Sequence, residues 1–138
     1  MNKVKVGFIS FAHMHAASYL FGMLKRDDVE VVGVADEDAE RVRPYSVDRG
    51  IPYYADYNEL LAQELDAVVI CSENARHAEI TKRAAAAGKH VLCEKPLGLS
   101  EAEMLEMIQV CKDNGVQLMT AFPCRYITSV RQAKEAID

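Results

Sequence analysis

The sequence predicts an α/β fold, in which helices flank both faces of a doubly wound, mostly parallel sheet with the strand order 3-2-1-4-5-6. Short apolar segments alternate with helix-like segments along nearly the whole chain, and this alternation is typical of βαβ units. The apolar segments are mostly continuous, as expected for strands that are buried on both faces. Right-handed crossover connections leave few other topologies for such strands.

The first half of the chain contains alternating predicted strands and helices. Acidic residues open the second helix, where they suit a helix N-terminus. Because Pro44 lies inside this helix, we expect it to be short, bent or late in starting. In chain order the elements are a strand at Val4–Ile9, a helix at Ala16–Lys25, a strand at Val29–Ala35, a helix at Asp36–Arg49, a short strand at 51–54 and a small helix at Tyr57–Gln63.

The second half continues the alternation and contains the clearest helix. Ser100 is its predicted N-cap, and Glu103 completes a capping box. Leu105, Ile108 and Cys111 are expected to form its apolar face. The elements are a strand at Asp66–Cys71, a helix at His77–Ala87, a strand at His90–Cys93, this helix between 101 and 115, a strand at Val116–Ala121 and a helical segment at Thr128–Asp138.

Charge, hydropathy and cysteine usage argue against several classes of protein. The net charge is −5 without a block of Lys or Arg, so a nucleic-acid partner is not expected. The apolar runs fall far short of the roughly 18 residues that a membrane helix needs. The N-terminus lacks the apolar region of a signal peptide. Four cysteines form no CxxC pair, which predicts structural thiols in a reducing, cytoplasmic compartment.

The first strand-to-helix turn is a candidate binding site, although it lacks glycines. In a dinucleotide-binding fold this turn reads G-x-G-x-x-G, and its backbone N–H groups bind a pyrophosphate. Here Ser10, Ala12 and His15 stand at the glycine positions. Serine and alanine are small enough for a phosphate to pass, whereas His15 either loosens the packing or contacts the ligand. Taken alone, the segment fits an ordinary loop at least as well.

Asp36, directly after the second strand, strengthens the cofactor hypothesis. It stands about 20 residues beyond the turn, where an acidic residue binds the ribose hydroxyls of the adenosine. Carboxylates at Asp36, Glu37 and Asp38 would repel a 2′-phosphate, which favours NAD over NADP, although Arg41 is near enough to weaken this preference. The alternative is a solvated acidic start of a helix.

The sequence Glu94-Lys95-Pro96 ends the fifth strand at the edge where parallel sheets bind ligands. Pro96 restricts the backbone of Lys95. A rigidly held lysine with a carboxylate to orient it can donate a proton or polarise a hydroxyl. A simple surface ion pair is the alternative.

The segment DAVVICSENARHAEITKRAAAAGKHVLCEKPLGLS resembles the core signature of the Gfo/Idh/MocA oxidoreductases. YADYNELLA and VQLMTAFPCRY match in style and place, so the resemblance covers essentially the whole chain. It implies an N-terminal Rossmann domain that binds NAD, or less favourably NADP, and an enzyme that oxidises a secondary alcohol of a sugar, cyclitol or related polyol. A non-catalytic module that binds or senses NAD(H) is the alternative.

The resemblance also implies roles for individual residues. Lys95 matches the lysine beside the nicotinamide and the reacting carbon, and is therefore the expected catalytic residue. Arg125 matches a position near the nicotinamide side of the cleft. The residues expected to bind the cofactor are Ser10, Phe11, Ala12, His13, Asp36, Cys71, Ser72, Glu73, Asn74, His77, Glu94, Lys95 and Arg125. Glu73 departs from the family's proline and places an anion near the cofactor.

The family pattern predicts how the chain is divided. Residues 1–125 are expected to form the dinucleotide-binding domain, and residues 126–138 the start of a connection to an α+β substrate domain that this chain lacks. We therefore expect this chain to be inactive alone, and the full-length protein to be a homo-oligomer that acts on a small polyol or sugar-like substrate.

The sequence His13-Met14-His15 does not by itself predict a metal site. Residues two apart on a helix do not face the same way, and no further ligand set is evident. Polar residues satisfied by the backbone or by water at a helix N-terminus are the simplest interpretation, and contact with a phosphate or a substrate is the alternative.

Overall fold

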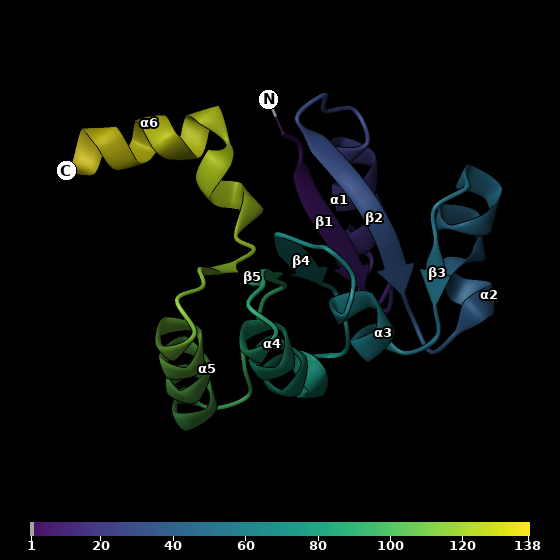
Figure 1. Ribbon diagram of the computed structural model, residues 1–138. Coiled ribbons are helices and arrows are strands. Elements are labelled where there is room, and N and C mark those ends of the chain that lie inside the picture. The colour runs from purple at the N-terminus through teal and green to yellow at the C-terminus, as the bar shows by residue number, and fades with distance from the viewer. Residues whose placement is uncertain (1) are drawn as a thin grey trace.

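Six parallel strands form one sheet in the computed structural model, which describes residues 2–138. The strand order is β3-β2-β1-β4-β5-β6, which confirms the predicted fold class and topology. Figure 1 shows helices on both sides of this sheet. The strands are β1 (Val4–Ile9), β2 (Val29–Ala35), β3 (Tyr53–Tyr54), β4 (Ala67–Ile70), β5 (His90–Cys93) and β6 (Leu118–Thr120).

The two faces of the sheet form separate apolar cores, because consecutive strand residues point to opposite faces. Phe8 packs with Leu20 of the first helix on one face. Its neighbour Ile9 packs with Leu60 and Ile80, from the third and fourth helices, on the other face. The helices are α1 (His15–Met23), α2 (Ala39–Val42), α3 (Tyr57–Leu61), α4 (His77–Ala86), α5 (Glu101–Asp113) and α6 (Thr128–Ile137), with 3-10 turns η1 (Arg43–Tyr45), η2 (Val47–Arg49), η3 (Asn74–Arg76) and η4 (Pro123–Tyr126).

The predicted N-cap of α5 is confirmed. The Ser100 hydroxyl accepts the Glu103 N–H at 3.2 Å. The Glu103 carboxylate accepts the N–H of Leu99 at 2.6 Å, one residue before the N-cap. This variant of the capping box satisfies N–H groups that a helix start would otherwise leave without partners.

One predicted helix is shortened at Pro44, as expected, and the buried face predicted for another requires correction. The polar helix expected at Asp36–Arg49 is reduced to α2, and the chain then continues as η1 and η2, because Pro44 lacks the N–H that an α-helix requires. In α5, Leu105 and Ile108 are exposed, whereas Met107 and Cys111 are buried. The helical period was correct, but α5 turns a different stripe towards α4.

The four cysteines are free thiols, and three of them are buried. Cys71, Cys93 and Cys111 are buried, whereas Cys124 is exposed. Burial raises the pKa of the Cys71 and Cys111 thiols and that of Cys93 to about 12, so these three thiols stay protonated at neutral pH. Within residues 2–138, no helix is both long and apolar enough to cross a membrane.

Gly33 in β2 tests the packing between the sheet and α3. A methyl group added there would lie 2.7 Å from Tyr54 Cε2 and 3.1 Å from Leu60 Cδ1. We expect Gly33→Ala to lower the free energy of unfolding by about 1–3 kcal/mol through overpacking. Gly22→Ala in α1 is the matched control, because nothing lies within 4 Å of the added methyl. It should raise stability by up to about 1 kcal/mol. Equal changes in the free energy of unfolding for the two variants, measured with urea, would contradict the close packing of α3 and Tyr54 around Gly33.

Candidate functional site

The carboxyl ends of the central strands bring the predicted site residues to one edge of the sheet. Ile9 pairs with both Ala35 and Ile70, and Ile70 pairs with Cys93. The residues that follow these strands therefore leave the sheet at one level. This edge includes the point between β1 and β4 where the strand order reverses, which is where open α/β sheets bind their ligands.

Side-chain acceptors hold the glycine-poor turn in shape. Ser10 adopts a φ of +66°, a left-handed conformation that glycine adopts without strain. The Ser10 hydroxyl accepts the Ala12 N–H at 3.1 Å, and Asp36 Oδ2 accepts the Phe11 N–H at 2.7 Å. The His13 N–H donates to the Cys71 carbonyl at 2.9 Å. These contacts fix the backbone of the turn although it lacks the glycines.

Asp36 is nearly buried, at 5% exposure, and links the ends of β1 and β2. Besides the Phe11 N–H, its carboxylate accepts the Asp38 N–H at 2.9 Å and lies 3.4 Å from the Arg41 guanidinium. The predicted ribose ligand is thus also a support for the turn, which is a role that the sequence analysis missed.

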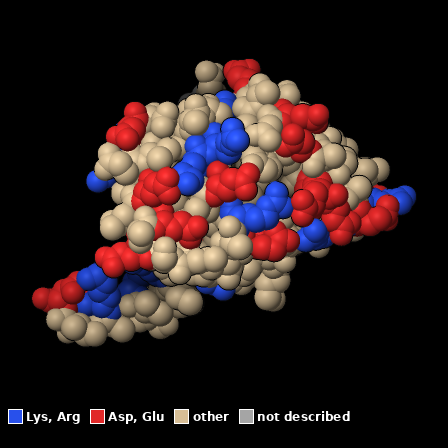
Figure 2. Space-filling model, turned by 90° about the horizontal axis from the view of Figure 1, so that it is seen from below, with Lys and Arg blue, Asp and Glu red and all other residues tan. Residues whose placement is uncertain are grey.

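A hollow of about 240 Å³ opens beside Asp36. Its lining includes Ser10 and Glu37 from the strand ends, Tyr57 from α3, and Arg76 and Ile80 from the α4 region. Arg76 pairs with Glu37 at 3.0 Å across it. Figure 2 views the molecule from the side towards which the arrow of β2 points in Figure 1, and shows basic and acidic side chains interleaved on this face. The lining of the hollow itself carries three carboxylates, of Asp36, Glu37 and Asp56, and one guanidinium, of Arg76, so the hollow is polar and net acidic.

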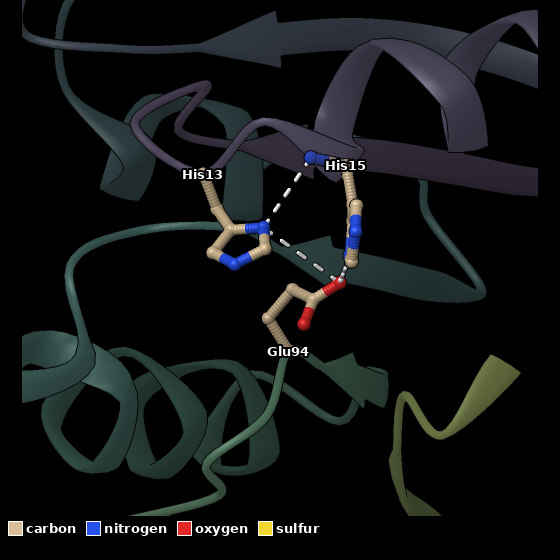
Figure 3. Close-up of side chains that lie close together, drawn as sticks. All are labelled: His13, His15 and Glu94. Carbon is tan, nitrogen blue, oxygen red and sulfur yellow. Dashed lines mark hydrogen bonds and ion pairs between the residues drawn. The ribbon is translucent and has the colours of Figure 1, made fainter. Parts of the chain in front are cut away.

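A second buried carboxylate at this edge, that of Glu94, directly follows β5 (Figure 3). Its side chain is fully buried. Glu94 Oε1 accepts the Tyr19 hydroxyl at 2.6 Å and lies 2.8 Å from His15 Nδ1. Glu94 Oε2 accepts the backbone N–H of Lys95 at 2.8 Å. His13 Nδ1 is 3.9 Å from Oε1. These contacts tie α1 to the end of β5.

The surroundings of Glu94 shift several pKa values. Burial alone would raise the pKa of Glu94, but the hydrogen bonds from Tyr19, His15 and the Lys95 N–H outweigh burial and lower it. Burial and the bond to Glu94 raise the pKa of Tyr19. Burial lowers the pKa of His13, the charge of Glu94 opposes this shift only in part, and the neighbouring His15 adds to the lowering. At neutral pH Glu94 is therefore ionised and His13 is neutral.

Two geometric premises of the sequence analysis were wrong. His13 and His15 do not lie on one helix, because α1 begins at His15, and both imidazole rings reach towards Glu94 (Figure 3). Glu94 does not orient the ammonium of Lys95, because it binds the Lys95 backbone N–H instead. Within residues 2–138 the Lys95 ammonium makes no ion pair, and its half-buried side chain is available to a ligand.

The loop after β4 contacts both the surroundings of Asp36 and the segment that contains Glu94. Cys71 and Ser72 are buried, while Glu73 and Asn74 are exposed, and Glu73 lies 3.8 Å from the Arg41 guanidinium. The fully buried His77 lies 2.8 Å from the Pro96 carbonyl through Nδ1 and 3.2 Å from the Ser72 carbonyl through Nε2. His77 thus links this loop to the Glu94-Lys95-Pro96 segment.

Arg125 is the predicted residue that the structure does not join to the others. It lies in η4, where its guanidinium stacks over the Phe122 ring at 5.2 Å. No hydrogen bond or ion pair of its side chain to the edge is found between residues 2 and 138. Conversely, Tyr19 and Arg76 contact the site residues Glu94 and Glu37 but were not predicted from the sequence. The apolar spacing of α1 makes Tyr19 resemble a core residue, and nothing local distinguishes Arg76 from other surface arginines.

The sheet order and the polar groups at its carboxyl edge define the NAD(P)-binding Rossmann class of domain. Residues 4–122 match the model of the oxidoreductase family with an NAD-binding Rossmann fold, GFO_IDH_MocA. The chain belongs to this Gfo/Idh/MocA family, as its sequence signature predicts.

Similarity to individual proteins agrees with this assignment. The chain is 40% identical over 110 residues to D-xylose 1-dehydrogenase (NADP(+)) 2 of Haloferax volcanii, which covers 78% of this chain and 34% of that protein. It is 35% identical over 114 residues to myo-inositol 2-dehydrogenase of Thermotoga maritima, and this match covers 81% of this chain and 34% of that protein. The crystal structure of a probable dehydrogenase from Thermotoga maritima superimposes with a TM-score of 0.89 at 29% identity, over 97% of this chain and 40% of that one. The chain spans about a third of the length of the curated relatives it matches.

Tyr19→Phe tests whether Glu94 joins α1 to β5. Removing a hydrogen bond to a buried carboxylate should lower the free energy of unfolding by about 1.5–3 kcal/mol at pH 7. Because the pKa of Glu94 is lowered in the folded chain, its stabilisation is complete above its ordinary value of 4.5 and is lost as the pH falls through the folded-state value. The difference between variant and parent should shrink accordingly in chemical unfolding below pH 4.5.

Tyr57→Phe is the matched control for this measurement. Its hydroxyl also donates to a carboxylate, Glu79, at 2.7 Å, but in an exposed position. We expect a smaller loss, about 0.5–1.5 kcal/mol. A larger loss for Tyr57→Phe than for Tyr19→Phe would show that the Glu94 contact is not the stronger constraint.

Proposed function

We propose that this chain is the nucleotide-binding part of an oxidoreductase that acts reversibly on a secondary alcohol of a sugar, a cyclitol or a related polyol. The observation that carries the proposal is that Asp36 and Glu94-Lys95 lie at one edge, on either side of the turn after β1. Relatives named as xylose and myo-inositol dehydrogenases support this substrate class.

The residues at the edge fit a dinucleotide. The hollow beside Asp36 offers a buried carboxylate to the adenosine ribose, and Ile80 and Tyr57 offer apolar walls. In the turn, the other N–H groups of residues 11–16 already have acceptors, whereas that of Met14 has none within residues 2–138. Met14 directly precedes α1, so its N–H and the positive end of the helix suit a pyrophosphate.

NAD is the cofactor we expect, with NADP less favoured. Asp36, Glu37 and Asp38 place carboxylates where a 2′-phosphate would lie. The nearby arginines are already paired, because Arg41 lies within 4 Å of the carboxylates of Asp36, Asp38 and Glu73, and Arg76 pairs with Glu37. Their charges are therefore largely compensated and offer less attraction to an additional phosphate.

Lys95 is the proposed catalytic residue. When bound, the nicotinamide supplies or accepts the hydride. The Lys95 ammonium then hydrogen-bonds the substrate oxygen and helps to move its proton, while Glu94 fixes the Lys95 backbone through the 2.8 Å bond to its N–H. His77 holds the following Pro96 carbonyl. Cys71, Ser72, Glu73 and Asn74 border the cofactor.

The remaining proposals concern the larger protein. We assign residues 1–125 to the dinucleotide-binding domain and residues 126–138 to a connection towards a substrate-binding region. In Figure 1, α6 extends away from the sheet and has no buried residue. We also propose cytoplasmic localisation, homo-oligomerisation of the full-length protein, and little turnover by this chain alone. Arg125 is kept as a proposed contact on the nicotinamide side.

Asp36→Asn tests the cofactor assignment. Asparagine keeps an oxygen that can accept the Phe11 N–H but loses the charge, so NAD⁺ affinity should fall about tenfold or more in calorimetric titration of this chain. Asp28→Asn is the control, because Asp28 precedes the opposite end of the same strand and is exposed. NADP⁺ binding tighter than NAD⁺ binding to the parent chain would refute the preference, and unchanged NAD⁺ affinity in Asp36→Asn would refute the ribose contact.

Lys95→Ala tests the catalytic role in a protein that carries this domain at the length of its relatives. With a panel of polyols and NAD⁺, kcat should fall about 10²–10⁴-fold while the KM for NAD⁺ changes little. Lys82→Ala, which removes an exposed partner of Glu106, should leave kcat unchanged. Unchanged kcat in Lys95→Ala would refute the catalytic role of Lys95. A protein without turnover that keeps its response to NAD(H) in Lys95→Ala would instead be a sensing module.

A further inference from the structure

We propose that His13, His15 and Glu94 form a binding site for a divalent transition metal ion of the Zn²⁺ type. This inference goes beyond the proposed oxidoreductase function and does not depend on it, because it rests on the donor atoms alone. One ligand atom from each residue lies within 4.8 Å of the other two, and Figure 3 shows the two imidazole rings facing the carboxylate.

The donor set has the chemistry that such ions prefer. Two imidazole nitrogens and one carboxylate oxygen are established ligands of Zn²⁺, Co²⁺ and Ni²⁺. Three protein ligands leave at least one coordination position for water or another small ligand. The donors come from the turn before α1, from its first residue and from the residue after β5, so strand ends on both sides of the strand-order reversal position the site.

The distances are close to those that a bound ion requires. Ligand bonds of about 2.0–2.2 Å in a tetrahedral site place neighbouring donors about 3.3 Å apart. The Glu94 Oε1 atom lies 2.8 Å from His15 Nδ1 and 3.9 Å from His13 Nδ1. These two separations bracket the required value, and the two imidazole donors lie within 4.8 Å of each other, so rotations of the imidazole side chains would bring the three donors around an ion.

Within residues 2–138, a single long hydrogen bond holds the His13 ring. Its Nδ1 lies too far from Glu94 Oε1, at 3.9 Å, for a hydrogen bond. Its one acceptor contact, with the His15 N–H, is long at 3.3 Å. A metal ion between His13 and Glu94 would replace this weak contact with a ligand bond, and it would account for the approach of a second imidazole to a carboxylate that His15 already satisfies.

The carboxylate is supported as metal ligands usually are. The Tyr19 hydroxyl donates to Oε1 and the Lys95 N–H to Oε2, and such outer contacts orient ligating groups. Access is available on the other side, because the side chains of His13 and His15 are 20% and 34% exposed. The site therefore combines a rigid buried ligand with two ligands that an ion can reach from solvent.

A Co²⁺ titration of this chain, without an affinity tag and without a dinucleotide, tests the proposal. The chain should carry Cys124→Ser, because the exposed thiol of Cys124 is a competing ligand. We expect one Co²⁺ per chain, the intense visible absorption of a low-coordinate site, and displacement by Zn²⁺. His13→Ala and His15→Ala should each weaken binding by more than the roughly 10–100-fold that loss of a supporting residue costs.

Two further variants make the result specific. Tyr19→Phe retains all three ligands and should weaken binding about 10–100-fold, with folding checked by circular dichroism. His90→Ala should leave binding unchanged, because His90 begins the strand that Glu94 follows and contacts Gln117 instead. Failure to saturate at millimolar Co²⁺, unchanged affinity in His15→Ala, or loss of the site in His90→Ala would overturn the proposal. None of these outcomes involves NAD⁺, so the proposed function is tested separately.

Discussion

Burial of the Glu94 carboxylate is the constraint on which the arrangement of this edge depends. A charged carboxylate without solvent costs several kcal/mol unless its oxygens are paired. Tyr19 and His15 of α1 and the Lys95 N–H supply these partners. Any movement of α1 away from β5 would therefore break several hydrogen bonds together. The same carboxylate fixes the backbone at Lys95, so the packing of α1 on β5 and the position of the Lys95 backbone depend on one group.

A second carboxylate compensates for the missing glycines at the other end of the turn. Asp36 accepts the Phe11 N–H, and Ser10 adopts the left-handed conformation in place of glycine. A strained backbone residue costs about 1–3 kcal/mol and persists where surrounding contacts determine it. At the third glycine position, His15 does not crowd the sheet but contacts Glu94. The motif is thus replaced by side-chain contacts that preserve the course of the turn.

The sequence was sufficient for the topology but not for these contacts. Continuous apolar strands such as Val4–Ile9 and the capping signal at Ser100 depend on local pattern, and they were predicted correctly. Which residues of α5 are buried depends on how this helix packs against α4. Leu105 was therefore predicted on the buried face, although it is exposed. The approach of His13, His15 and Tyr19 to Glu94 spans more than 70 residues of chain, and no periodicity encodes such a distance.

The most direct measurement is to map NAD⁺ onto the amides of the ¹⁵N-labelled chain by nuclear magnetic resonance. If the carboxyl edge binds the dinucleotide, the largest shifts will fall at Met14, Glu37 and Ser72, together with Lys95 on the nicotinamide side. Lys5 and Asp66, which are joined by a hydrogen bond near the opposite ends of β1 and β4, will remain unshifted. Saturable shifts at Lys5 and Asp66 with none at Met14 would contradict the assignment of this edge as the cofactor site.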